Sequence, residues 1–280
     1  MRDPDAIVRE LLPLVRAFCV GEPCVALGGS HAKGTADAHS DVDVYLFAES
    51  FLPAARRSEL VAARLGDAAQ PVSWGADDPF VEGGTDFRLD GVRVECWLRR
   101  ASTVQATIAD CLAGRIRREY TVWTAMGYFN YVALSDVHSM RIIDDPAGML
   151  ARWKAQVAVY PEPLRDAILS RFMAEAAFWP DNPHYLSAIE RGDVIYTSAI
   201  VQQVLHALIQ VVFALNREYF PGEKQLAEAL EALEALTVAP ARFAENVETL
   251  LCPGRAPNSA ESREQARALT SLVADVRGLL

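Results

Sequence analysis

The sequence predicts an α/β + α protein, with a small mixed sheet and flanking helices first and a helical bundle second. Segments with apolar residues at every second position lie mainly before residue 100, where they alternate with segments of helical spacing. From about residue 101 the helical spacing dominates, apart from one short extended segment near residue 142. We therefore expect an α/β domain over residues 1–135 and a helical domain over residues 136–280.

The expected elements of the first domain follow from these spacings. The dipeptide Asp90-Gly91 separates two alternating runs, which is a strong signal for a β-hairpin. Helices are predicted at 5–18, 30–35 and 53–65, and strands at 24–27, 41–47, 85–89, 92–98 and 142–146.

Helical periodicity over the second half predicts a bundle. The helices are expected at 147–158, 162–178, 183–190, 193–216, 223–236, 240–250 and 260–279. The helix at 193–216 is apolar on nearly every side, so it should lie at the centre of the bundle.

Composition limits the classes of partner. The chain has 280 residues, of which 51% are hydrophobic and 23% charged, as in a folded domain. Its 37 acidic and 27 basic residues give a net charge of −10, with only three lysines. Because proteins bind nucleic acids through basic surface, this balance argues against a nucleic-acid partner but not against a small phosphorylated ligand.

Other features favour a cytoplasmic protein without a membrane partner. The five cysteines show neither metal-ligand nor disulfide spacing, and the first residues lack the pattern of a signal peptide. The apolar stretch 194–215 is long enough to cross a bilayer, but Gln203, His206 and Gln210 favour a buried helix instead. The sequence leaves the oligomeric state open.

The chemistry is concentrated in one short segment. Gly28, Gly29 and Ser30 follow a strand and open a helix, where backbone N–H groups and a hydroxyl can bind phosphate. Asp41 and Asp43 are two residues apart on the next strand, so their carboxylates share one face. Two carboxylates this close repel each other unless a cation lies between them, and oxygen-only ligands favour Mg²⁺.

A third carboxylate is expected on a neighbouring strand. Glu95 points away from the side of Val94 and Cys96 and shares its face with Arg93 and Trp97. If this strand lies beside 41–47, Glu95 completes a cluster of three carboxylates near the glycine turn. Such a cluster suits two-metal phosphoryl transfer. The alternative is that Glu95 only pairs with a neighbouring arginine.

The arrangement of Gly29 and Ser30, then Asp41 and Asp43, then Glu95 resembles the nucleotidyltransferase superfamily of DNA polymerase beta. Within it, the chain is most similar to the small bacterial enzymes that adenylylate lincosamide and aminoglycoside antibiotics. The resemblance covers about 70 residues of the first domain and implies the mixed sheet of that superfamily.

A second stretch carries a further resemblance to some of these relatives. Asn216, Tyr219, Pro221 and Lys224 match an Asn-x-x-Tyr-x-Pro-x-x-Lys element of their helical domain. The resemblance implies a nucleotide held between the two domains, with Lys224 as a further phosphate contact.

The resemblance also implies roles for the residues of the first motif. Asp41 and Asp43 would bind two Mg²⁺ ions, and Glu95 would be a third metal ligand or the general base. Ser30, with the backbone of Gly28 and Gly29, would hold the triphosphate of ATP or another nucleoside triphosphate.

We therefore expect a Mg²⁺-dependent enzyme that transfers AMP from ATP to a hydroxyl of a small molecule, such as an antibiotic, and releases pyrophosphate. One alternative is a toxin–antitoxin type nucleotidyltransferase that modifies protein or tRNA. Another is a non-catalytic nucleotide-binding or antitoxin module. Gln203, His206 and Gln210 follow one helix face, where they would contact either the acceptor or neighbouring helices.

Overall fold

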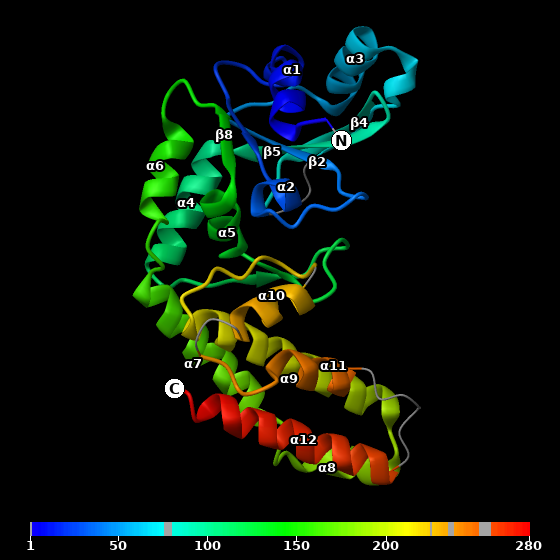
Figure 1. The fold of residues 1–280 in the computed structure, drawn as a ribbon, viewed down its shortest axis with the longest axis vertical. Helices are drawn as coiled ribbons and strands as arrows, with labels where there is room; N and C mark the ends of the chain where they lie inside the picture. The colour runs from blue at the N-terminus through cyan, green and yellow to red at the C-terminus, as the bar shows by residue number, and fades with distance from the viewer. Residues whose placement is uncertain (1, 76–79, 225, 235–237, 252–258) are drawn as a thin grey trace. The chain divides into compact units, whose positions relative to one another are not determined.

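A computed structural model describes residues 2–75, 80–224, 226–234, 238–251 and 259–280 (Figure 1). The chain forms two compact units. We call the first the α/β unit; it comprises Met1–Cys111, Arg117–Thr121 and Phe129–Val159. We call the second the helical unit; it comprises Leu112–Ile116, Val122–Tyr128 and Tyr160–Leu280. The predicted fold class is confirmed.

The α/β unit is built on a mixed six-stranded sheet with the strand order β3-β4-β5-β2-β1-β8. The strands are β1 (Cys24–Leu27), β2 (Val42–Ala48), β3 (Val72–Gly75), β4 (Gly83–Leu89), β5 (Val92–Arg100) and β8 (Arg141–Asp144). Strands β2 and β5 are parallel, and the other neighbours are antiparallel. A second, two-stranded sheet consists of β6 (Arg118–Glu119) and β7 (Tyr128–Phe129).

The predicted hairpin is present as β4 and β5. Asp90 and Gly91 both have positive φ, at 50° and 83°, as the tight turn of a two-residue hairpin requires. Strand β3 was not predicted, because it is an edge strand in which no residue is buried, so it has no apolar run like that of β1.

Helices cover both faces of this sheet (Figure 1). On one side lie α1 (Pro4–Arg16) and α3 (Ala54–Leu65), with a short 3₁₀ turn at Asp67–Ala69. The other side carries α2 (Gly29–Lys33), α4 (Ala101–Leu112), α5 (Val132–Ser139) and α6 (Met149–Gln156). On that second side Phe47 of β2 packs edge-on against Trp153 of α6, with 5.3 Å between ring centroids.

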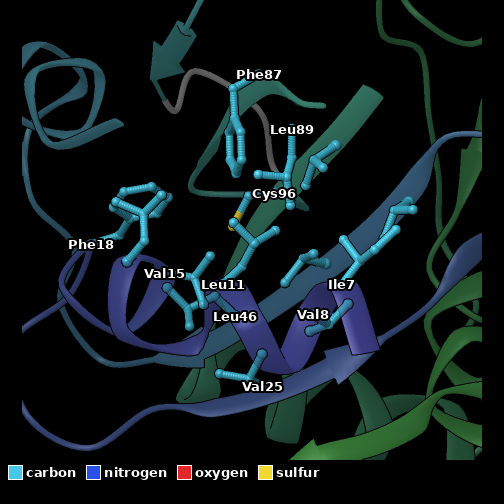
Figure 2. Packing of buried hydrophobic residues seen from close by; sticks show 14 of the residues in the cluster. Ile7, Val8, Leu11, Val15, Phe18, Val25, Leu46, Phe87, Leu89 and Cys96 are labelled. Carbon is cyan, nitrogen blue, oxygen red and sulfur yellow. The ribbon is translucent and has the colours of Figure 1, made fainter. Parts of the chain in front are cut away.

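The core of the α/β unit lies between the sheet and α1 (Figure 2). Every third or fourth residue of α1 is apolar, and Val8 and Val15 are fully buried there against β1, β2 and β5. Leu46 and Cys96 come from the alternate positions of β2 and β5 that face α1. The intervening positions of β2 and β5 therefore point to the other face of the sheet, where the candidate functional side chains lie.

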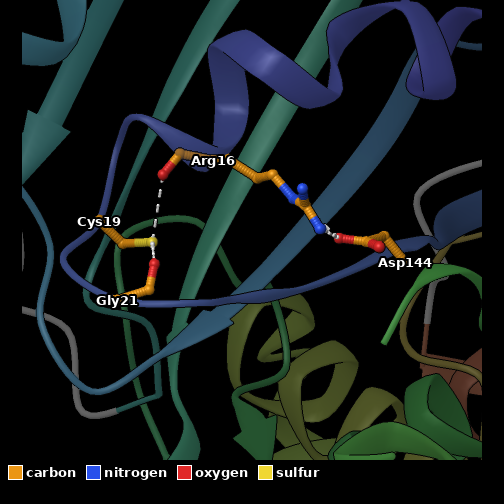
Figure 3. A network of polar contacts seen from close by, with 4 residues as sticks. All are labelled: Arg16, Cys19, Gly21 and Asp144. Carbon is orange, nitrogen blue, oxygen red and sulfur yellow. Dashed lines mark hydrogen bonds and ion pairs between the residues drawn. The ribbon is translucent and has the colours of Figure 1, made fainter. Parts of the chain in front are cut away.

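Strand β8 brings a later segment of the chain into the α/β unit. It pairs with β1, and Arg16 at the end of α1 donates through Nε to Asp144 of β8 at 2.8 Å (Figure 3). In the same view the thiol of Cys19 donates to the carbonyls of Arg16 and Gly21, which closes the turn after α1. Because β8 carries α5 and α6 with it, this unit extends to Val159, beyond the division expected at residue 135.

The helical unit contains α7 (Glu162–Phe178), α8 (Pro183–Arg191), α9 (Val194–Leu215), α10 (Leu226–Glu234), α11 (Phe243–Leu251) and α12 (Ser259–Arg277). These helices agree with the predicted ones to within a few residues, although residues 225, 235 and 236 of the expected 223–236 helix lie outside the described residues. Helix α9 packs against α7, α8, α11 and α12, so it is the central helix, as expected. Among the described helices it alone is long and apolar enough to span a membrane, but most of it is buried.

The polar residues of α9 differ in their burial. His206 and Gln210 are buried, and their side chains contact each other at 3.4 Å, whereas Gln203 is exposed. This contact lies within α9, so whether these residues contact the acceptor or neighbouring helices stays a prediction.

Candidate active site

The turn between β1 and α2 packs closely against β2. The N–H of Gly28 donates to the carbonyl of Asp43 at 2.9 Å. Gly29 has a φ of +58°, and a Cβ added there would lie 1.7 Å from Oδ2 of Asp43. The glycine is therefore required both by the backbone conformation and by the carboxylate that occupies its side-chain space.

Helix α2 is fixed at its far end as well. Lys33 forms an ion pair with Asp136 of α5 at 3.5 Å, and both side chains are largely buried. Gly34 ends the helix in the left-handed conformation, with a φ of 78°. Ser30 is half-buried at the start of α2. Its contact with a triphosphate stays a prediction.

Three carboxylates meet where β2 and β5 lie side by side. The register of this parallel pair places Asp43 directly beside Glu95, and Asp41 immediately precedes β2. One oxygen from each of the three side chains lies within 4.8 Å of the others, and all three residues are half-buried. Three carboxylate oxygens at this spacing are suited to a hard divalent cation such as Mg²⁺, with water and substrate oxygens completing its coordination. We call these residues the carboxylate cluster.

A fourth carboxylate lies on the same face of the sheet. Asp86 of β4 is directly opposite Glu95, so that Asp86, Glu95 and Asp43 form a row across three strands. The indole of Trp74 donates to the carboxylate of Asp86. Sequence reasoning missed Asp86, although the hairpin register set by Asp90-Gly91 places it opposite Glu95.

A row of aromatic residues runs beside the row of carboxylates. Trp74, Trp97 and Tyr45 are in register across the sheet, and Gly84 between the two tryptophans leaves space for the Trp74 ring. Trp74 meets Trp97 edge-on at 5.5 Å, and Trp97 stacks on Tyr45 at 6.4 Å. This packing fixes the Trp97 indole, whose Nε1–H donates to Oδ1 of Asp43 at 3.2 Å.

The hydrogen bond from Trp97 should orient Asp43 for metal binding, because groups around a ligand commonly set its direction. We expect Trp97→Phe, which keeps an aromatic ring but removes the donor, to weaken Mn²⁺ binding by about 10-fold. Trp74→Phe is the matched control, since the Trp74 indole donates to Asp86 instead. Titration calorimetry with Mn²⁺ measures both variants, and equal affinities for the two would contradict this role of Trp97.

Burial and the neighbouring carboxylates change the titration of Glu95. Burial raises the pKa of Glu95 to about 7, with further contributions from its hydrogen bond with Asp41 and from the charges of Asp41, Asp43 and Asp86. Burial also raises the pKa of Asp86. The guanidinium of Arg93 forms ion pairs with Glu95 and, at 3.8 Å, with Asp41.

The raised pKa of Glu95 predicts a pH-dependent stability of the metal-free protein. The value rises from 4.5 to about 7 on folding, so between these pH values the folded chain holds a proton that the unfolded chain has released. This contribution to the free energy of unfolding is complete below pH 4.5 and is lost as the pH rises through 7. Allowing for partial exposure, we expect a loss of about 2 kcal/mol.

Urea unfolding in EDTA at several pH values, compared between wild type and Glu95→Gln, measures this effect. The variant should lack this loss, so its stability relative to the wild type should increase across the window. If the free energies of unfolding of the wild type and the variant changed in parallel with pH, the raised pKa of Glu95 would be contradicted. Adding Mg²⁺ at pH 7.5 should restore stability to the wild type but not to Glu95→Gln.

The second motif lies in the helical unit, where its residues have structural contacts. The side-chain amide of Asn216 donates to the carbonyl of Val238 at 2.9 Å and accepts from its N–H at 3.0 Å. Glu223 accepts from the backbone N–H groups of Ala125 and Met126. Lys224 is exposed, and its contact with phosphate stays a prediction.

Comparisons with known proteins add the following findings. A family model described as a domain of unknown function (DUF4037) matches residues 129–226. None of the curated proteins compared with this chain matches its sequence. A solved structure described as a nucleotidyltransferase-like protein from Exiguobacterium sibiricum 255-15 is similar at 13% identity and a TM-score of 0.48, over 97% of this chain and 75% of that one.

Proposed function

We propose that the chain is a Mg²⁺-dependent nucleotidyltransferase that transfers a nucleoside monophosphate, AMP from ATP, to a hydroxyl of a small molecule. The observation that carries the proposal is the pairing of Asp43 with Glu95 in the parallel register of β2 and β5, with Asp41 beside them. This pairing brings Glu95 beside two aspartates that lie more than 50 residues earlier in the chain, next to a glycine turn whose backbone contacts Asp43.

The residues present fit a divalent metal centre. The donor set consists only of carboxylate oxygens, and the side-chain space of Gly29 is filled by the Asp43 carboxylate. Asp41, Asp43 and Glu95 would hold two Mg²⁺ ions, and Trp97 would keep Asp43 in position. Bound Mg²⁺ offsets charge on the triphosphate and on the attacking oxygen. Ser30 and the backbone of Gly28 and Gly29 would bind the β- and γ-phosphates.

The reaction forms one bond and breaks one. The oxygen of the acceptor hydroxyl bonds to the α-phosphorus, and the bond from that phosphorus to the oxygen bridging to the β-phosphorus breaks. Pyrophosphate leaves with the electron pair of that bond, and the hydroxyl proton passes to water. The acidic charge of the chain suits a cationic acceptor such as an aminoglycoside, which is the acceptor class we would test first.

The test is incubation of the purified full chain with α-labelled ATP and Mg²⁺, with and without a panel of lincosamides and aminoglycosides. We expect pyrophosphate release and a labelled small molecule, both abolished by EDTA. Label on a protein or on tRNA would instead support the toxin–antitoxin type of activity. ATP binding without any transfer, even with a cell extract supplied as a source of acceptors, would support a non-catalytic module and contradict the proposal.

A further inference from the structure

Arg93 places its positive charge beside the carboxylate cluster. It is two residues before Glu95 on β5, so both side chains project from the same face of the sheet. Its guanidinium forms an ion pair with Glu95 and lies 3.8 Å from Asp41. Arg93 therefore contacts two of the three carboxylates assigned to the metal.

The two sides of this ion pair differ in their exposure to solvent. The Arg93 side chain is 58% exposed, whereas the side chains of Glu95 and Asp41 are 17% and 29% exposed. Glu95 lies on β5 and Asp41 immediately precedes β2, while the arginine reaches them from solvent on a long side chain. An ion pair with an exposed partner contributes little free energy, so a divalent cation can replace the guanidinium.

We propose that Arg93 is a triphosphate-binding residue that Glu95 and Asp41 hold in place until divalent metal takes over these carboxylates. This inference rests on the proposed function. Once the carboxylates bind metal, their charge is offset and the guanidinium no longer has an excess of negative charge beside it. A triphosphate bound beside the metal would then attract the guanidinium, which matches pairs of phosphate oxygens with two parallel hydrogen bonds.

The role makes two opposite predictions for Arg93→Gln. Removing the competing cation should tighten binding of Mn²⁺ alone by about 3-fold, in line with the small free energy of an exposed ion pair. Removing the phosphate contact should weaken binding of α,β-methylene-ATP in the presence of Mg²⁺ by about 10-fold or more. A residue with only a structural role would not change the two affinities in opposite directions.

Arg88→Gln is the matched control. Arg88 lies directly opposite Arg93 on β4 and is exposed, but its guanidinium donates to the carbonyl of Gly91 at 3.3 Å. The substitution removes the same charge from the same strand pair without touching the carboxylate cluster. Arg93→Lys keeps the charge and loses the paired hydrogen bonds, so it should bind Mn²⁺ like the wild type and the nucleotide analogue more weakly.

Calorimetric titration of the full-length variants, with circular dichroism to verify folding, separates the outcomes. Opposite shifts for Arg93→Gln, absent from Arg88→Gln, would support the inference. An unchanged or weaker Mn²⁺ affinity, or an unchanged affinity for the analogue, would overturn it while leaving the proposed function intact. If the wild type binds neither Mn²⁺ nor the analogue, the proposed function fails and the inference fails with it.

Discussion

Replacing Asp43 with asparagine is expected to abolish nucleotidyl transfer, with a loss of at least about 1,000-fold in kcat, because metal-mediated charge stabilisation contributes several kcal/mol. Within the carboxylate cluster, Asp43 contacts the neighbouring strand, the aromatic row and the glycine turn. It lies beside Glu95, accepts from Trp97, and fills the space at Gly29. The variant should also lose measurable Mn²⁺ binding in a calorimetric titration.

The same substitution should leave the fold intact or make it more stable, because it removes one of several carboxylates that repel each other. Asp90→Asn is the matched control. Asp90 is 73% exposed in the hairpin turn of the same unit, and asparagine tolerates its positive φ. We expect wild-type activity from this control. Full activity in a folded Asp43→Asn protein would exclude the proposed mechanism.

Replacing Gly29 with alanine is expected to have the second-largest effect, because the new methyl group would overlap the Asp43 carboxylate. The backbone conformation alone costs an L-residue about 1–2 kcal/mol, and the overlap adds a similar amount. We expect a loss of about 3 kcal/mol in the free energy of unfolding, measured with urea. The displaced carboxylate should also reduce transfer by about 100-fold, since small misplacements of reacting groups are this costly.

Gly34→Ala separates backbone strain from overlap. Gly34 also has a positive φ, of 78°, and it ends the same short helix, but an added Cβ would meet nothing within 4 Å. The control should therefore lose only about 1 kcal/mol and keep its Mn²⁺ affinity. Equal losses of Mn²⁺ affinity in the two variants would show that the turn, rather than the contact with Asp43, limits metal binding.

Local patterns were sufficient to predict much of the fold. Alternation along 41–47 and 92–98 gave the strands and the faces of their side chains, and the burial of Val94 beside the half-buried Glu95 agrees with it. Asp90-Gly91 gave the hairpin and its turn. These features depend on neighbours a few residues apart, so a sequence pattern is enough to specify them.

Long-range pairing could not be derived in the same way. Nothing in the spacing of Asp41 and Asp43 specifies that β5, some 50 residues later, pairs with β2 in parallel. From the sequence, that neighbourhood is only a condition for the carboxylate cluster. The contact of Arg93 with Asp41 depends on the same pairing, and the row from Trp74 to Tyr45 needs β3, which the pattern did not reveal. Tertiary pairing, rather than local propensity, assembles the site.

The position of β8 has a consequence for how the chain folds during synthesis. Strand β1, which leads into the glycine turn, has β2 on one side and β8 on the other. Until residues 141–144 have left the ribosome, one edge of β1 has no partner within the sheet and is open to pairing with other chains. The nascent chain must therefore carry an unprotected edge next to its candidate active site while about 100 further residues are added.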